Sequence, residues 1–154
     1  MLITALVAFG HFFAFFALTA ALVLQLTLLT DSISLATARR IQRADQVYGL
    51  MAVLVLVFGF LRVFYFEKSA DYYFNNDFFL LKMSLLVVIG LISIYPTVTY
   101  LRWNANLKLD IAPQLSERMV QKIRKIIHTE LVFIIAVLLC ASMMAKGVDL
   151  PVSF

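Results

Sequence analysis

The chain has 154 residues, of which 63% are hydrophobic and only 14% are charged. Soluble domains are roughly half apolar and about one quarter charged, so this composition excludes an ordinary soluble domain and a disordered chain. The formal net charge is +4. The basic residues lie between apolar runs, which favours contact with anionic phospholipid headgroups over nucleic acid. The sequence therefore predicts an integral membrane protein with the lipid bilayer, and no nucleic acid, as its partner.

Apolar runs in chain order predict four membrane-spanning helices, at residues 2–29, 46–66, 78–101 and 126–145. Each run has about the 20 residues that a span requires. No Asp, Glu, Lys or Arg occurs from Met1 to Thr30, which indicates a retained first helix and not a cleaved signal peptide. The predicted fold class is all-α, a single antiparallel four-helix bundle of the membrane. Tyr100 and Trp103 suit an interfacial aromatic belt at the end of the third span.

Basic residues are divided unequally between the two ends of this bundle. The first and third connections, with the adjoining helix ends, contain nine of them: Arg39, Arg40, Arg43, Arg102, Lys108, Arg118, Lys122, Arg124 and Lys125. The other end contains four: Arg62, Lys68, Lys82 and Lys146. Because basic residues are retained in short cytoplasmic loops, we expect both termini outside the cytoplasm of a bacterial inner membrane. The third connection also predicts an amphipathic helix, whose basic face lies against lipid headgroups.

Three ionisable residues within the spans are candidates for a binding site. An ionisable side chain in a span costs about 2.5–3.5 kcal/mol on insertion scales. His11 lies about 15 Å along the first helix, too deep to reach water easily. Antiparallel order places Arg62 and Lys82 in the same outer portion of the bilayer, where they could hold carboxylates of an amphipathic molecule. The alternative is that both cations extend to lipid phosphates and that His11 bonds a backbone carbonyl one turn back in its own helix.

Small residues follow one face of the first span at helical spacing: Gly10, Ala14, Ala17 and Ala21. Such a stripe allows a neighbouring helix to approach closely in a membrane. His11 lies about 100° around the helix from Gly10. We therefore expect its imidazole to point into the bundle or into a crevice between helices.

A second polar group is expected near the cytoplasmic interface. Glu130 and His128 lie early in the fourth span, while Arg43 and Asp45 lie at the facing start of the second span. A structural ion pair between Arg43 and Glu130 is the predicted arrangement, with a proton-relay role for the Glu130 carboxylate as the alternative. The two histidines lie at different depths, so a centre with several histidine ligands is not expected.

The chain resembles the HemJ-type bacterial protoporphyrinogen oxidases and the related copper-resistance protein D-like proteins, as a divergent member of this superfamily. Three stretches carry the resemblance: Gly10-His11, Phe79-Leu80-Leu81-Lys82-Met83-Ser84, and Thr129-Glu130 with the aliphatic run that follows. The resemblance implies a b-type haem bound through His11, a propionate contact at Lys82, and oxidation of protoporphyrinogen as the activity.

The leading functional hypothesis is an inner-membrane redox protein that binds a tetrapyrrole, haem b or a porphyrin. His11 would be the haem iron ligand, with Arg62 and Lys82 as further cofactor-binding residues and quinone or a respiratory partner as the electron acceptor. The alternative is a non-catalytic assembly factor or a small subunit of a membrane complex, whose polar residues only orient helices. A copper or anion transporter is a weaker hypothesis, because four spans form a pore only as a homo-oligomer.

Overall fold

The structure is a computed structural model that describes residues 1–66 and 73–148. This part of the chain contains four helices long and apolar enough to span a membrane. They are α1 (Leu2–Leu28), α2 (Leu35–Leu61) with its π-helical continuation η1 (Arg62–Phe66), α4 (Asp77–Arg102) and α6 (Glu117–Ala145). A short helix, α5 (Asn104–Lys108), follows α4. The described residues contain no strand, and the prediction of an all-α membrane helix bundle is confirmed.

Side-chain caps determine where the later long helices begin. The caps are Ser34, Asn76 and Ser116, which accept hydrogen bonds from the backbone N–H groups of Thr37, Phe79 and Met119. An N-cap satisfies a backbone donor that the first helical turn leaves without a partner. As a result, α2 and α6 begin at residues 35 and 117, earlier than the predicted spans at 46 and 126. The amphipathic segment and the fourth span therefore form one continuous helix.

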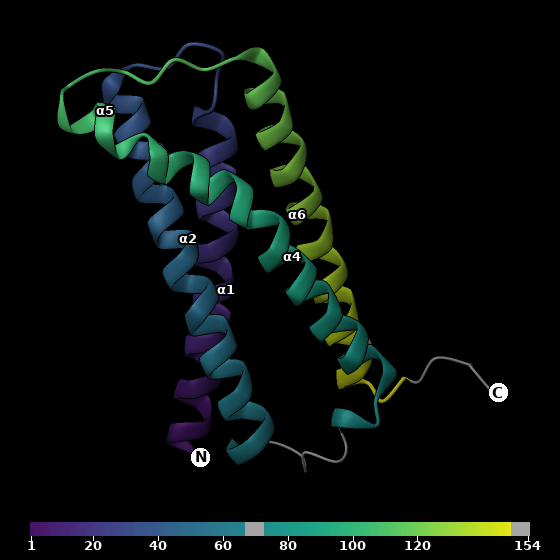
Figure 1. The fold of residues 1–154 in the computed structure, drawn as a ribbon. Helices are drawn as coiled ribbons and strands as arrows, with labels where there is room; N and C mark the ends of the chain where they lie inside the picture. Colours follow the sequence, from purple (N-terminus) through teal and green to yellow (C-terminus); the bar gives the residue numbers. More distant parts are fainter. Residues whose placement is uncertain (67–72, 149–154) are drawn as a thin grey trace.

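The helices are arranged as two hairpins, α1 with α2 and α4 with α6 (Figure 1). The hairpins lie close together near the end that carries α5 and diverge toward the end that carries the N-terminus. We call these the packed end and the divergent end. Side chains with almost no exposure belong mainly to the packed end: Leu22, Leu29, Ala38, Ile41, Tyr100, Val120, Ile123 and Ile127. The hydrophobic core of the bundle is thus concentrated in one half of its length.

Small residues bring α1 and α2 into close contact. Ala14 and Ala21 are buried between the helices. At Gly10, an added Cβ would lie 2.8 Å from Cζ of Phe58 on α2, which is closer than van der Waals contact allows. The small-residue stripe therefore faces α2, as the sequence predicts, and it fixes how α1 is rotated within the hairpin.

The outward faces of the helices are strongly apolar. Large hydrophobic side chains that are more than half exposed occur on α1, α2, α4 and α6, among them Phe9, Phe16, Leu50, Leu91 and Ile135. In water, so large an apolar surface would promote aggregation or association. A bilayer provides the apolar surroundings that these faces need, since lipid tails are as apolar as leucine.

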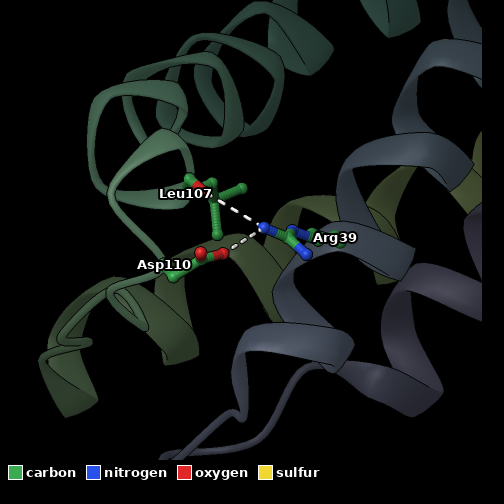
Figure 2. Close-up of polar contacts among 3 residues, drawn as sticks. All are labelled: Arg39, Leu107 and Asp110. Atoms are coloured by element: carbon green, nitrogen blue, oxygen red, sulfur yellow. Dashed lines mark hydrogen bonds and ion pairs between the residues drawn. The ribbon is translucent and has the colours of Figure 1, made fainter.

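An ion pair ties α2 to α5 at the packed end (Figure 2). Nη2 of Arg39 donates to the backbone oxygen of Leu107 over 3.2 Å and to Oδ1 of Asp110 over 2.6 Å. Asp110 adopts a positive φ of 55°, a conformation that Asp tolerates better than most residues. These contacts fasten the turn after α5 onto the first hairpin.

The aromatic pair at the end of α4 is buried. Tyr100 is 0% exposed and Trp103 is 5% exposed, and their ring centroids lie 4.9 Å apart in an edge-on arrangement. The prediction that these rings form an interfacial belt facing lipid is therefore wrong. They close the packed end of the protein, because the inward face of α4 continues through both positions.

Candidate functional site

A cavity of about 930 Å³ lies between the two hairpins at the divergent end. Side chains from α1, α2, η1, α4 and α6 form its wall, and His11, Arg62 and Lys82 are all among them. The volume lies near the upper limit of the 300–1,000 Å³ that is typical of ligand sites. The structure therefore brings together the three side chains that the sequence singles out in the outer portion of the spans.

The His11 side chain is oriented by the backbone of α2. Its Nδ1 lies 3.1 Å from the carbonyl oxygen of Val55. A carbonyl oxygen only accepts hydrogen bonds, so Nδ1 carries a proton, and in the neutral imidazole Nε2 then carries the lone pair. The partner is a carbonyl of the neighbouring helix, not one in the first helix itself. This is the arrangement that fixes ring orientation and tautomer in metal-binding histidines.

Gly59 provides space for the imidazole on α2. A Cβ added to Gly59 would lie 3.3 Å from Cε1 of His11. Side-chain contacts that short are uncommon, so a larger residue here would push the ring away from the Val55 carbonyl. His11 and Gly59 therefore form a matched pair across the α1–α2 interface.

Arg62 lies at the junction between α2 and η1. The π-helical turn changes the hydrogen-bond pattern after residue 61, and such turns occur frequently at functional sites. The guanidinium carbon of Arg62 lies 5.3 Å from the ring centroid of Phe12 on α1. This cation–π contact keeps the charge near the cavity while its aliphatic stem remains among apolar groups.

Lys82 lies on the opposite wall of the cavity, early in α4. Its Nζ is 4.9 Å from the ring centroid of Phe79, which is one turn earlier in the same helix. Phe79 is buried with Val63 and Tyr73, and Met83 and Met144 pack against this cluster. The two methionines thus serve as apolar packing, and the part of the chain that the structure describes contains no group of three or more His, Cys, Asp or Glu able to hold a metal.

The cavity reaches the lipid-facing surface of the bundle. Phe12, Phe60 and Leu138 belong to its wall, and each is between 45% and 62% exposed. Part of the cavity wall therefore also belongs to the apolar outer surface of the bundle.

The predicted ion pair between Arg43 and Glu130 is not formed. Arg43 is exposed, whereas Glu130 is 0% exposed and neither of its carboxylate oxygens has a hydrogen-bond partner in residues 1–66 and 73–148. The reason is the rotation of α2: Asp45 and Tyr48 occupy its inward face, and Arg43 is about 160° around the helix from Asp45. His128 is also exposed, and its Nδ1 lies 2.7 Å from the Arg124 carbonyl of its own helix.

The structure adds a buried acidic cluster that the sequence did not reveal as a unit. Glu130 lies within electrostatic range of Asp45, Tyr48 and Tyr100. Asp45 marked only the start of a span in the sequence, and Tyr100 was assigned to the membrane interface. Their spacing contained a signal, because Asp45 and Tyr48 are three residues apart and so share one face of a helix.

This architecture defines a multi-pass membrane protein with a cavity between two helical hairpins. Residues 3–149 match the family described as "Predicted membrane protein (DUF2214)", and the chain belongs to that family. The match does not place the chain among the HemJ-type oxidases or the copper-resistance protein D-like proteins. No curated protein matches the chain, and no solved structure matches it.

Proposed function

We propose that the cavity at the divergent end binds a tetrapyrrole and that the protein is a redox protein of the bacterial inner membrane. One observation carries the proposal: a histidine held by a backbone carbonyl lines the same cavity as two cationic side chains. A tetrapyrrole is a large, flat and mainly apolar molecule with carboxylates at one edge. It requires this combination of an apolar wall, a nitrogen ligand and a cationic rim.

Each of the three residues has a distinct role in this proposal. His11 would ligate the iron of haem b through Nε2, since Nδ1 donates to the Val55 carbonyl and a neutral imidazole is a common axial ligand. Arg62 and Lys82 would bind the carboxylates by charge-assisted hydrogen bonds, which are stronger than neutral ones. Bound haem would supply one-electron chemistry, while the chain orients the ligand and limits its contact with water.

The partly exposed aromatic residues of the cavity wall support a reaction partner from the bilayer. Phe12 and Phe60 lie where the cavity meets the lipid-facing surface. Both a porphyrin substrate and a quinone acceptor partition into the membrane. An oxidoreductase of the protoporphyrinogen oxidase type could therefore exchange both molecules through the gap between hairpins.

The absorption spectrum of protein purified in mild detergent tests this proposal. We expect a Soret band and visible bands that change on reduction with dithionite, either in the protein as isolated or after titration with haem. His11→Ala should abolish these bands with helix content unchanged by circular dichroism. His128→Ala is the matched control, because His128 is exposed and bonds its own helix.

Two outcomes would count against haem ligation. If His11→Leu keeps full ligand content, the imidazole does not ligate the ligand. If folded wild-type protein stays colourless even with added haem, the non-catalytic assembly factor or small subunit becomes the better hypothesis. In that case His11→Leu should be tolerated or stabilising, because it replaces a polar group by one that suits an apolar environment.

We infer the orientation in the membrane from the placement of charge. Among the described residues, the end carrying α5 has nine basic residues and the end carrying the N-terminus has three, Arg62, Lys82 and Lys146, while Lys68 lies outside the described residues. The termini should therefore face away from the cytoplasm. Single cysteines can be introduced at exposed positions 106 and 146 in a Cys140→Ala background. An impermeant thiol reagent should label position 146 on intact spheroplasts, and labelling at position 106 instead would show the reverse orientation.

A further inference from the structure

The Glu130 carboxyl group is buried without any partner that could stabilise a negative charge. Its exposed fraction is 0%, and both of its oxygens lack a hydrogen-bond partner among the described residues. An isolated ionised carboxylate in a medium of low polarity is so unfavourable that the group neutralises instead. In the folded protein, Glu130 must therefore carry a proton or share its site with another cation.

Among the described residues, the titratable groups that face Glu130 from the other helices carry no positive charge. From α2 these are Asp45 and Tyr48, and from α4 the titratable group is Tyr100. Among the titratable side chains of α1 there is only His11, which lies in the cavity at the other end. Tyr100 is also 0% exposed, and its hydroxyl has no hydrogen-bond partner in the described part of the chain. Glu130 and Tyr100 are thus two buried polar groups without a hydrogen-bond partner among the described residues.

Polar side chains connect this cluster to the surface of the packed end. Nε2 of Gln42 donates to Oδ1 of exposed Asn104 over 2.8 Å. One turn further into the bundle, the Thr97 hydroxyl donates to Oδ1 of Asp45 over 2.9 Å. Another turn inward, Ser93 and Tyr48 lie near each other, and the Ser93 hydroxyl donates to the Gly90 carbonyl of its own helix over 2.9 Å.

This series has the spacing of two facing helical stripes. Positions 42, 45 and 48 lie along one side of α2, positions 93 and 97 share a face of α4, and position 104 begins α5, which follows α4. The stripes lead from the exposed surface to Glu130. We refer to these six residues as the polar track: Gln42, Asp45, Tyr48, Ser93, Thr97 and Asn104.

Beyond Glu130 the interior becomes apolar. Ile134 and Val137 follow on the inward face of α6 and are buried, and Val137 is the first α6 residue of the cavity wall. Seven residues of helix separate Glu130 from Val137, which is about 10 Å. A layer of apolar side chains therefore lies between the polar track and the cavity.

We propose that Glu130 is a proton-binding site that exchanges with the packed end of the bundle through the polar track. The proton neutralises the Glu130 carboxyl group: it enters from the surface of the packed end, passes along the hydroxyl groups of the track to the Asp45 carboxylate, and is given up from there to Glu130. This site is separate from the cavity at His11 and does not require a ligand there. The competing occupant is a monovalent cation such as Na⁺, which would leave Glu130 ionised.

Infrared spectroscopy distinguishes these occupants, because a protonated carboxylic acid has a carbonyl band distinct from the bands of a carboxylate. We expect purified protein at neutral pH in sodium-free buffer to show an acid carbonyl band that shifts in D₂O. Glu130→Gln should abolish the band, whereas Glu117→Gln should leave it intact. Glu117 is a suitable control because it lies on the same helix and is exposed. Circular dichroism should establish that both variants fold.

Three results would overturn the assignment. A band that survives Glu130→Gln and disappears in Asp45→Asn would place the proton on Asp45. The absence of an acid band, with carboxylate bands that respond to added Na⁺, would make the cluster a cation site. The absence of both signals would mean that Glu130 is ionised without either occupant, which contradicts the proposal.

The rate at which the acid carbonyl band of Glu130 shifts in D₂O tests whether protons reach it through the polar track. Thr97→Val removes the hydroxyl that donates to Asp45 and should slow the shift several-fold without removing the band. Thr19→Val is the control, since the Thr19 hydroxyl bonds the Phe15 carbonyl of its own helix and lies outside the polar track. Equal exchange rates in the two variants would show that protons reach Glu130 by another path.

Discussion

The two halves of the bundle solve the problem of polar groups in an apolar environment in opposite ways. At the divergent end, Arg62 and Lys82 border a cavity and lie against aromatic rings. At the packed end, Asp45 and Glu130 are buried near Tyr48 and Tyr100. Cations with long side chains can adjust to a ligand or to lipid, whereas short buried carboxyl groups depend on neutralisation. The divergent end is therefore suited to binding molecules, and the packed end to holding small ions.

The largest difference in the free energy of unfolding is expected when the same substitution, Ala→Leu, is made in both halves of the bundle. Ala38 is 0% exposed at the packed end, whereas Ala141 is half-buried on the wall of the cavity. Ala38→Leu should lower the free energy of unfolding by about 3 kcal/mol because a filled core resists added methylene groups. Ala141→Leu should change it by less than about 0.5 kcal/mol while reducing ligand occupancy. Unfolding in mixed detergents measures the free energy of unfolding of both variants. If the two variants lose equal stability, the two halves of the bundle do not differ in packing.

Gly10 provides the next test, which concerns the close contact between α1 and α2. Gly10→Val should lower the free energy of unfolding by about 2 kcal/mol, since its first added carbon would meet the Phe58 ring. Gly49→Val is the matched control on the second helix, where a Cβ meets nothing within 4 Å. Because residue 10 precedes His11, the first variant should also disturb the imidazole and reduce ligand retention. Similar stability of the two variants would show that α1 and α2 tolerate separation.

Removing the cations of the cavity should affect binding more than folding. Arg62→Ala and Lys82→Ala should each weaken retention of a tetrapyrrole by about 1.5 kcal/mol, the contribution of one charged hydrogen bond. The double variant should lose less than the sum if both side chains hold the same carboxylate edge. Lys146→Ala serves as the control, as Lys146 is exposed at the same end and outside the cavity wall. Retention can be followed by the Soret absorbance during gel filtration.

The smallest effect is expected for the ion pair at the packed end. The side chains of Arg39 and Asp110 are 47% and 75% exposed, and exposed pairs contribute little. Arg39→Ala should lower the free energy of unfolding by about 0.5 kcal/mol, with the exposed neighbour Arg40→Ala as the reference. A loss well above that in the reference would indicate that the turn after α5 stabilises the whole packed end.

The sequence identified the divergent end better than the packed end. Apolar runs gave the helices, and their antiparallel order was sufficient to bring His11, Arg62 and Lys82 to one cavity. The Val55 carbonyl that orients His11 could not be predicted, because a backbone acceptor leaves no trace in residue type. Haem binding itself remains a proposal.

The packed end was misjudged because helix rotation was unknown. Arg43 and Asp45 are two residues apart, and only one of them can face the bundle interior. Charge complementarity favoured Arg43 as the partner of Glu130, yet close packing of small residues such as Ala14 and Ala38 turns Asp45 inward. Rotation depends on contacts along the whole α1–α2 interface, so a single pair of charges does not determine it.

The length of α6 determines how far the basic residues of its first turns lie from the hydrocarbon layer of the membrane. Its 29 residues extend about 43 Å at 1.5 Å per residue, whereas the hydrocarbon layer is about 30 Å thick. Roughly two turns of rigid helix therefore project past the lipid tails, and they carry Arg118, Lys122 and Arg124. A thicker membrane would draw these charges toward the tails and a thinner one would lift them from the phosphates, so the protein should sit best in bilayers of matching thickness.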